Sequence, residues 1–345
     1  MNKISLCVTS YNRPDTLRQL INSYLRQNYP NKELVISDDT PNNSIEKLIA
    51  EFRNEKTIKY FHNQPGLGFS KNLLKSIERA TGDYLILLGD DDVFFSKSVL
   101  SDYVKVFEEN PSVGFVYANQ VRFSNAMKIE YIANFSLKNK LFKNGKEAME
   151  NMWFKSIFIG GIGIRNSKDI VNYYPKKTIL HPQVELIGNI IVKKDAYIIA
   201  KNYIGFRSHD DQIIFRALKD KKIRQEGEHV TVEFFDIFIK LKKKYKLKLD
   251  FDFLGKQLSE LQIIMMFKEK SVLGSRSMEE NYLKFCEIYK QAKNSFKFRA
   301  AFILAKILPA SSIVFSRKLS FYLIFLIKGR NYPKLERQLV AMISD

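Results

Sequence analysis

Three consecutive aspartates, Asp90, Asp91 and Asp92, are the residues of this sequence whose type and spacing point most directly to chemistry. They follow the run 83–88, which is rich in apolar residues and typical of a buried strand, so the carboxylates stand at a strand end. Neighbouring carboxylates repel one another and so raise one another's proton affinity, and a divalent cation offsets this repulsion. Carboxylate oxygens suit Mg²⁺ or Mn²⁺, which also bind substrate phosphates. The alternative is an acidic turn that caps a helix through residues 98–109.

Two more polar clusters follow strand-like runs in the first part of the chain. The apolar run 4–9 leads into the polar residues 10–12, and the run 33–37 leads into Asp38 and Asp39. The carboxyl ends of parallel strands meet at one edge of a sheet, and the ligands of such sheets bind beyond that edge. The three clusters are therefore expected to lie together, which favours a binding site over a single solvated turn.

The elements that must position these clusters alternate along the chain. Apolar residues repeat at helical spacing within 17–25, 45–52 and 73–80, and a further strand is expected at 57–61. This order predicts an α/β fold, in which helices flank both faces of a mainly parallel sheet.

The chain changes in character at about residue 211. Beyond it long helical stripes dominate and Gly and Pro become sparse, so we expect a first domain over 1–211 and a helical extension over 212–345.

Positive charge is concentrated in this extension. The formal net charge of the chain is +19, and the extension has 27 Lys and Arg against 14 Asp and Glu, which is +13 of that total. That excess indicates an anionic partner such as a membrane surface, or a soluble basic surface without one. The acidic clusters of the first domain would repel nucleic acid, so we expect none to bind.

Neither a secretory signal nor a membrane span is indicated. The amino-terminal run 4–9 is too short for a signal peptide, and no stretch approaches the ~20 apolar residues that cross a bilayer. Cys7 and Cys286 lie far apart, so neither a disulfide framework nor a thiolate metal site is expected. We predict a cytoplasmic protein.

Two apolar stripes in the extension, at 296–308 and 313–327, are interleaved with basic residues. We expect them to lie peripherally on the inner face of the cell membrane, or to pack on the first domain or on a second copy of the chain.

Four segments together resemble the family 2 glycosyltransferases. They are Thr9-Ser10-Tyr11-Asn12-Arg13, Glu33–Asp39, Asn63–Asn72 and Ala80–Asp92. The resemblance is strong over about 3–118, looser over 119–211 and absent from the extension. Within the family, the sequence is most similar in character to the abequosyltransferase-like subgroup. It implies the GT-A fold, with a nucleotide-binding half at about 1–118 and an acceptor half at about 119–211. It also implies a nucleotide-sugar donor, most simply UDP-linked, and a divalent cation, Mn²⁺ or Mg²⁺, at an Asp-x-Asp motif.

The resemblance assigns nucleotide-binding roles to the residues at matching positions. They are Thr9, Tyr11, Asp38, Asp39, Lys71 and Asp90. Asp39 would accept a hydrogen bond from the base, such as the N3–H of uracil, and Asp90 would lie near the ribose. Plainer alternatives are packing on the first helix for Tyr11, an Asx-turn for Asp38 and an exposed helix face for Lys71.

By the same resemblance Asp91, the last residue of the Asp-x-Asp motif, would ligate the metal with help from Asp92 or His209. Gly89 departs from the family pattern, because it stands where the motif has its first aspartate. Arg207 and His209 match an Arg-x-His segment of the family and would contact the diphosphate, since a guanidinium fork suits phosphate oxygens.

On the acceptor side, the Glu-Asp pair that carries the base in many family members is absent. The comparable segment is 180–186, and His181 is the candidate for the base or for an acceptor contact. An imidazole titrates near neutral pH, which suits base work, and Glu185, one helical turn on, would orient it or act itself. Alternatively His181 only begins a helix beside Pro182, or the enzyme is retaining and needs no such base. The glycine-rich run 160–163 is interpreted as a close-packed turn under the acceptor site.

The sequence thus predicts an enzyme: an inverting, metal-dependent glycosyltransferase of bacterial cell-surface polysaccharide synthesis. It would move a sugar from a nucleotide-diphosphate donor to a glycan or a lipid-linked glycan. The alternative from another class is a non-catalytic basic module that docks on an anionic polymer or a membrane. A nucleotidyltransferase also places aspartates on an α/β sheet, but residues 10–13 are not the Gly-rich phosphate loop expected of one.

Overall fold

The computed structural model describes residues 1–208, 230–249, 251–309 and 332–344. The chain divides into two compact units, one of residues 1–209 with 332–345 and the other of residues 210–331. The predicted boundary between 211 and 212 falls outside the described residues and stays a prediction.

The first unit is built on one mixed sheet with the strand order β3-β2-β1-β4-β9-β6-β10-β5. Its first four strands in the chain are β1 (Ile4–Ser10), β2 (Lys32–Asp38), β3 (Ile58–His62) and β4 (Tyr84–Gly89). All of these pair in parallel, with β1 between β2 and β4. Every residue of β1 is buried, as expected for a strand covered on both faces. The predicted α/β fold and its four leading strands are confirmed.

The other half of the sheet is where the topology departs from a simple parallel order. Its strands are β5 (Val93–Phe94), β6 (Val113–Ser124), β7 (Ile129–Ala133), β8 (Lys140–Phe142), β9 (Ile162–Arg165) and β10 (Asp195–Ser208). The short strand β9 is antiparallel to both of its neighbours, β4 and β6, and thereby joins the two halves. The predicted turn at 160–163 is thus half turn and half strand.

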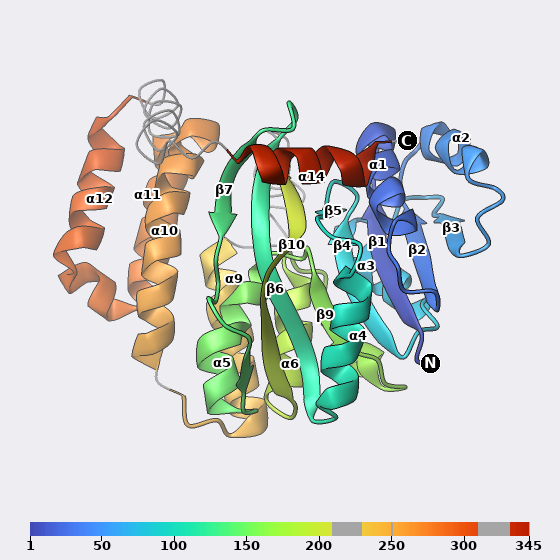
Figure 1. The fold of residues 1–345 in the computed structure, drawn as a ribbon. Helices are drawn as coiled ribbons and strands as arrows, with labels where there is room; N and C mark the ends of the chain where they lie inside the picture. Colours follow the sequence, from blue (N-terminus) through green and yellow to red (C-terminus); the bar gives the residue numbers. More distant parts are fainter. Residues whose placement is uncertain (209–229, 250, 310–331, 345) are drawn as a thin grey trace. The chain divides into compact units, whose positions relative to one another are not determined.

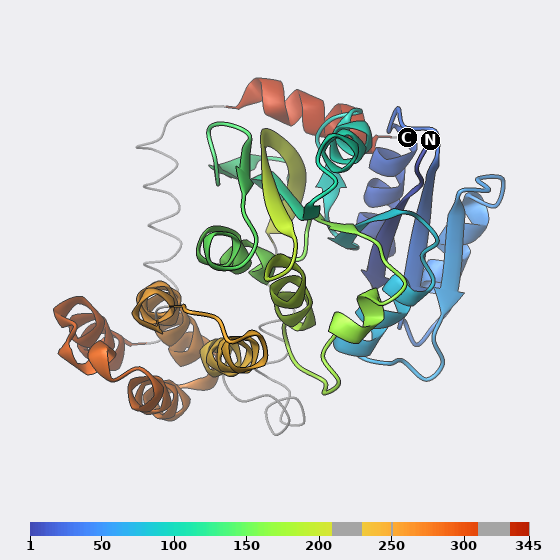
Figure 2. The ribbon, with the colours of Figure 1, turned by 90° about the horizontal axis from the view of Figure 1, so that it is seen from below.

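Helices cover both faces of this sheet. They are α1 (Pro14–Leu25), α2 (Ser44–Glu51), α3 (Phe69–Glu78), α4 (Val99–Glu109), α5 (Lys146–Met152) and α6 (Pro182–Ile191). Seen along the sheet, α4 lies over one face, and α5 and α6 lie over the other (Figures 1 and 2). The helix α1 begins at Pro14, whose fixed φ and missing N–H suit a first helical turn.

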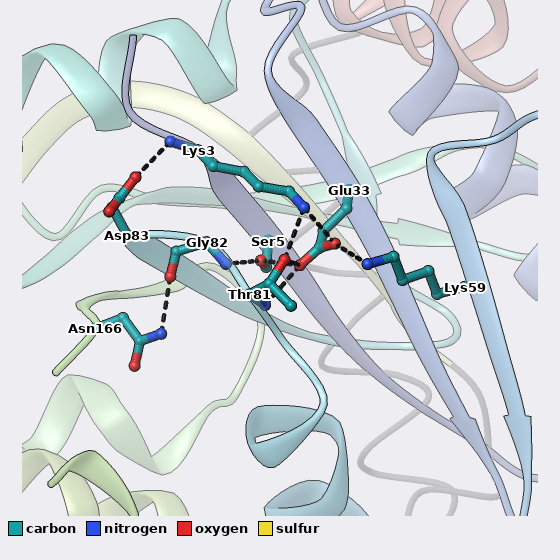
Figure 3. Close-up of polar contacts among 8 residues, drawn as sticks. All are labelled: Lys3, Ser5, Glu33, Lys59, Thr81, Gly82, Asp83 and Asn166. Carbon is teal, nitrogen blue, oxygen red and sulfur yellow. Dashed lines mark hydrogen bonds and ion pairs between the residues drawn. The ribbon is translucent and has the colours of Figure 1, made fainter. Parts of the chain in front are cut away.

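A buried carboxylate ties together the amino ends of the parallel strands. The Glu33 side chain accepts hydrogen bonds from Ser5 Oγ at 2.6 Å and from the Thr81 backbone N–H at 2.7 Å. It also forms ion pairs with Lys3 at 2.7 Å and with Lys59 at 2.9 Å (Figure 3). These partners come from β1 and the residue before it, from β3 and from the turn before β4, so one side chain of β2 holds three other chain segments at the end of the sheet opposite to the acidic clusters.

The last helix, α14 (Pro333–Ile343), belongs to the first unit, although we predicted one extension over 212–345. It packs against α1, where Asn22 Nδ2 donates to the carbonyl of Ile343 at 3.0 Å. Figure 1 shows α14 lying across the top of the sheet. Its side chains Leu339 and Met342 are buried in the core of the unit.

The described residues of the second unit form helices. The structure describes α9 (Val230–Tyr245), α10 (Phe251–Leu273), α11 (Ser275–Ile288) and α12 (Phe296–Ile307) in it. Their shared core includes Phe235 and Phe285, whose rings lie 5.5 Å apart. None of the helices that the structure describes is long and apolar enough to cross a membrane. The stretch 313–327, predicted to be an apolar helix, lies outside the described residues.

Candidate active site at the carboxyl edge of the parallel strands

The three polar clusters converge, as predicted. In the sheet register Thr9 is opposite Gly89, and Ser10 is opposite Asp38, so β1, β2 and β4 end at the same level. The segment after β1 touches both acidic clusters. The Ser10 carbonyl accepts from the Asp39 N–H at 3.0 Å, and the Tyr11 N–H donates to Asp90 Oδ2 at 3.0 Å.

An arginine that the sequence analysis did not assign bridges two of the three aspartates. Arg13 Nη2 lies 3.0 Å from Asp90 Oδ1, and Arg13 Nη1 lies 2.7 Å from Asp91 Oδ2. Burial alone would lower the pKa of Arg13, but the carboxylates of Asp90, Asp91 and Asp92 outweigh it and raise that pKa. The guanidinium therefore stays charged. In the sequence, the position of Arg13 directly before Pro14, at which α1 begins, could have indicated this role.

The three aspartates are not equivalent. Burial raises the pKa of Asp90 to about 7, with Asp91 acting in the same direction and Arg13 opposing. Burial and the charge of Asp91 also raise the pKa of Asp92 well above its ordinary value. The Asp92 Oδ2 atom accepts the Gly89 N–H at 2.8 Å, which fixes it within the turn. Asp91 is the accessible member, with 19% of its side chain exposed.

A divalent cation would have to use this partly exposed carboxylate. Within the part of the chain that the structure describes, no three His, Cys, Asp or Glu side chains are placed to hold one ion together. His209, a predicted ligand, lies outside the described residues. Mg²⁺ and Mn²⁺ commonly bind through one or two carboxylates, several waters and substrate phosphates. The donor set at Asp91 therefore fits an ion that shares its shell with a diphosphate.

Asp39 holds the loop that opens the third helix. Its Oδ1 atom accepts from Asn63 Nδ2 at 2.9 Å, and its Oδ2 atom accepts the Gly68 N–H at 2.8 Å. The amide of Asn63 also reaches Ser37 Oγ at 3.1 Å, and Arg79 donates to Asn63 Oδ1 at 3.0 Å. This network around Asn63 positions Asp39 at the rim, and the sequence analysis gave no role to either Asn63 or Arg79.

Asp38 is fully buried, whereas Asp39 is 8% exposed, and like Asp39 it has partners at both oxygens. Oδ1 accepts from the Thr40 N–H at 3.0 Å and from Thr40 Oγ1 at 2.6 Å. Oδ2 accepts from the Tyr60 hydroxyl at 2.8 Å. This geometry matches the Asx-turn interpretation, and a nucleotide contact for Asp38 stays a prediction.

The other predicted nucleotide-binding residues differ in exposure. Thr9 is buried at the end of β1, whereas Tyr11 is 43% exposed just beyond it. Lys71 lies on α3 and is exposed. Tyr11 is thus an aromatic side chain at this edge that is exposed enough for a base or a sugar to reach, and the roles of all three residues stay predictions.

Arg207 reaches the same edge from the far half of the sheet. It is buried near the end of β10, with its guanidinium 4.6 Å from the ring centre of Phe123. It also bonds the side chain of Gln19 on α1. Burial lowers the pKa of Arg207, and the nearby carboxylates of Asp91 and Asp92 act against that. The structure therefore brings this predicted diphosphate residue to the acidic cluster.

The predicted acceptor-side residues are buried at the start of α6. His181 directly precedes the helix, and its carbonyl accepts the Val184 N–H at 3.0 Å. Glu185 follows in the first turn. Trp153 Nε1 donates to the Val184 carbonyl at 3.0 Å and anchors this turn. The catalytic roles of His181 and Glu185 stay predictions.

Comparison with known proteins finds similarity over the first part of the chain. Residues 5–169 match the family model for glycosyl transferase family 2. An uncharacterized glycosyltransferase of Rickettsia conorii is 37% identical over 109 residues, which are 31% of this chain and 18% of that protein. The abequosyltransferase RfbV of Salmonella typhimurium is 36% identical over 100 residues, 28% of this chain and 30% of that protein. The chain thus matches less than a third of the length of either relative.

A third relative has a more specific name. The Escherichia coli protein WfgD, a UDP-Glc:alpha-D-GlcNAc-diphosphoundecaprenol beta-1,3-glucosyltransferase, is 26% identical over 143 residues, which are 41% of this chain and 55% of WfgD.

Solved structures share the fold. Residues 1–349 of Staphylococcus aureus TarS, in complex with UDP-GlcNAc, align with a TM-score of 0.59 at 13% identity, covering 88% of this chain and 89% of that one. The Pyrobaculum calidifontis mannosyltransferase PcManGT, in complex with GDP-Man and Mn²⁺, aligns with a TM-score of 0.50 at 12% identity, covering 99% of this chain and 86% of that one. The fold is the GT-A fold of glycosyltransferases, as predicted.

Proposed function

Residues 5–169 of the chain match the model of glycosyl transferase family 2, and from that premise we propose that the protein transfers a sugar from a nucleotide-diphosphate donor to a saccharide acceptor. The observation that carries this proposal is the convergence of the polar ends of β1, β2 and β4 at one edge of the sheet. Ligands of parallel sheets bind at such an edge.

UDP-linked sugars are the proposed donors. Asp39 and the exposed Tyr11 would bind the nucleoside, with Asp90 at the ribose. The TarS structure with UDP-GlcNAc and the UDP-Glc activity in the name of WfgD support this choice. For the acceptor we propose a glycan or a lipid-linked glycan of bacterial surface polysaccharide synthesis, because WfgD acts on a diphosphoundecaprenol-linked sugar and RfbV is an abequosyltransferase.

The proposed reaction is inverting. His181, with Glu185 one turn on, would take the proton from the acceptor hydroxyl as the diphosphate leaves. Arg207 and a divalent cation at Asp91, Mn²⁺ or Mg²⁺, would stabilise the negative charge that develops on the diphosphate. The Mn²⁺ complex of PcManGT supports the use of a cation. Asp92 and His209 complete the proposed set of metal contacts.

A peripheral position at the inner face of the cell membrane is part of the proposal. The exposed side chains Phe296, Ile303 and Ile307 of α12 stand among the exposed basic residues Lys297 and Lys306. An apolar face with flanking cations is typical of helices that lie at anionic membrane surfaces. The same face could instead bind a second copy of the chain.

The test is a panel of nucleotide sugars incubated with the purified protein and Mn²⁺, with release of nucleoside diphosphate measured without an acceptor. We expect hydrolysis of one UDP-sugar. Asp91→Asn should lower it roughly 10²-fold or more, the scale typical for loss of one charge-stabilising group. The matched control is Asp15→Asn, because Asp15 is an exposed aspartate in the first turn of α1. Unchanged turnover in Asp91→Asn would refute the assignment, and no hydrolysis of any sugar would favour the non-catalytic module.

A further inference from the structure

The ion pairs of Arg13 are the feature of the site that the proposed function does not use. One guanidinium spans two adjacent aspartates, with its Nη2 atom 3.0 Å from Asp90 and its Nη1 atom 2.7 Å from Asp91. The contact with Asp91 is also a charge-assisted hydrogen bond, which is stronger than one between neutral groups. Arg13 thus directly contacts the carboxylate to which the cation is assigned.

The backbone around Arg13 is fixed, so this contact is built into the fold. Asn12 adopts a left-handed conformation with φ 56°, and its N–H donates to Thr40 Oγ1 at 2.8 Å. Helix α1 starts immediately after Arg13, at Pro14. A turn held on one side and a helix on the other leave the guanidinium aimed at the carboxylates.

A guanidinium and a divalent ion compete for Asp91. A bound Mg²⁺ lies about 2.0–2.1 Å from its oxygen ligands, and Asp91 Oδ2 already faces Arg13 Nη1 at 2.7 Å. Like charges a few ångströms apart also repel across a partly buried site. Arg13 therefore opposes the binding of an ion by the protein alone. A diphosphate changes this balance, because it adds negative charge and further oxygen ligands.

We propose that Arg13 is a positioning residue that occupies Asp91 in the nucleotide-free protein, so that the divalent ion binds only together with the diphosphate of the donor. Asp91 then exchanges the guanidinium for the ion. This inference rests on the proposed function, since it assumes that Asp91 contributes to a cation site. Under this proposal the Arg13 side chain prevents the ion from binding before the diphosphate.

The test measures Mn²⁺ binding directly, from the electron paramagnetic resonance signal of free Mn²⁺ in solutions of the full-length protein. Without nucleotide, Arg13→Gln should bind Mn²⁺ at least about tenfold tighter than the wild type, a difference of about 1.4 kcal/mol. With saturating UDP the two proteins should differ less. The double variant Arg13→Gln with Asp91→Asn should lose the gain, which assigns the new binding to Asp91.

Arg18→Gln is the matched control, because Arg18 lies on the same helix and pairs with the surface residue Glu51 at 2.6 Å. It should bind Mn²⁺ as the wild type does. Arg13→Lys keeps a positive charge without the guanidinium fork, so its Mn²⁺ affinity should lie between those of the wild type and Arg13→Gln. It replaces Arg13→Gln in the test if that variant does not fold.

Equal Mn²⁺ affinity in Arg13→Gln, Arg13→Lys and the wild type would overturn the inference. So would a wild type that binds Mn²⁺ as tightly without UDP as with it. Failure of the proposed function looks different: no nucleotide sugar would be hydrolysed in the presence of Mn²⁺, while UDP would still strengthen Mn²⁺ binding by the wild type and Arg13→Gln would still gain Mn²⁺ affinity through Asp91.

Discussion

Gly89 stands at the motif position where the family has an aspartate, and its surroundings show what that position allows. A Cβ atom added there would lie 2.7 Å from Asp91 Oδ1 and 3.4 Å from Asp92 Oδ2. The atom that would have to move first is the end of a carboxylate side chain, not backbone. Any side chain at 89 would therefore displace Asp91 before it disturbed the strand.

We predict that Gly89→Ala folds with little loss of stability but impairs the site. The free energy of unfolding should change by less than about 1 kcal/mol, as is usual where a flexible side chain can yield. UDP-sugar turnover should fall at least about tenfold, because about 1 Å of misplacement is costly at a reacting centre. Urea unfolding and nucleoside diphosphate release measure the two quantities. Wild-type turnover in Gly89→Ala would show that the position of Asp91 is not critical.

At the level of residues, the sequence revealed the carboxylates but not their partners. Asp39 and Asp90–Asp92 stand at strand ends, which periodicity alone can locate. Arg13 and Asn63 act through contacts with residues 78 and 24 positions away in the chain. Such partners depend on how the strands are ordered in the sheet, and a single sequence does not specify that order.

The elements of the sheet are tied at their amino ends by Glu33, whose ionisation links strand packing to pH. Burial would raise the pKa of this carboxyl, but hydrogen bonds from Lys3, Ser5 and Lys59 outweigh it and lower the pKa from 4.5 to about 2. A carboxyl with a depressed pKa stabilises the fold fully above its unfolded value. It loses that contribution as the pH falls through the folded value.

We predict that Glu33→Gln lowers the free energy of unfolding at pH 7 by about 3 kcal/mol, the size of the linked pKa change. The difference from the wild type should shrink as the pH falls from 4.5 to 2, because the wild-type carboxyl then becomes neutral as well. Denaturant unfolding at several pH values measures this. Glu109→Gln is the control, since Glu109 pairs with Lys105 at 3.7 Å and both side chains are mostly exposed. A pH-independent difference would contradict the prediction.

Among the elements, the four leading strands and their helices followed from local patterns, whereas β9 did not. This strand has four residues and lies antiparallel between β4 and β6. Gly163 within it leaves room for the ring of Tyr103, which an added Cβ would approach to 2.7 Å. Gly163, which looks like part of a turn in the sequence, is thus required by a helix elsewhere in the chain.

On the scale of the whole molecule, the carboxyl-terminal helix α14 completes the core of the first unit. Leu339 is fully buried there, while its neighbour Val340 is 46% exposed. We predict that Leu339→Asp lowers the melting temperature of the full chain and its free energy of unfolding by about 3 kcal/mol or more, because it buries an unpaired charge. Val340→Asp, one residue on, should change it by less than about 0.5 kcal/mol. Equal effects of the two substitutions would mean that α14 does not pack as described.

The return of α14 makes the second unit an insertion in the first rather than an appendage at its end. Shortening the chain through α14 would therefore remove part of the core of the first unit before it removed any of the second unit. A first unit on its own would instead require removal of residues 210–331 and a linker between its two parts. Cleavage of one of the two connections between the units would leave two fragments that still purify together. The contacts of α14 with α1 would hold them, because these contacts do not depend on that connection.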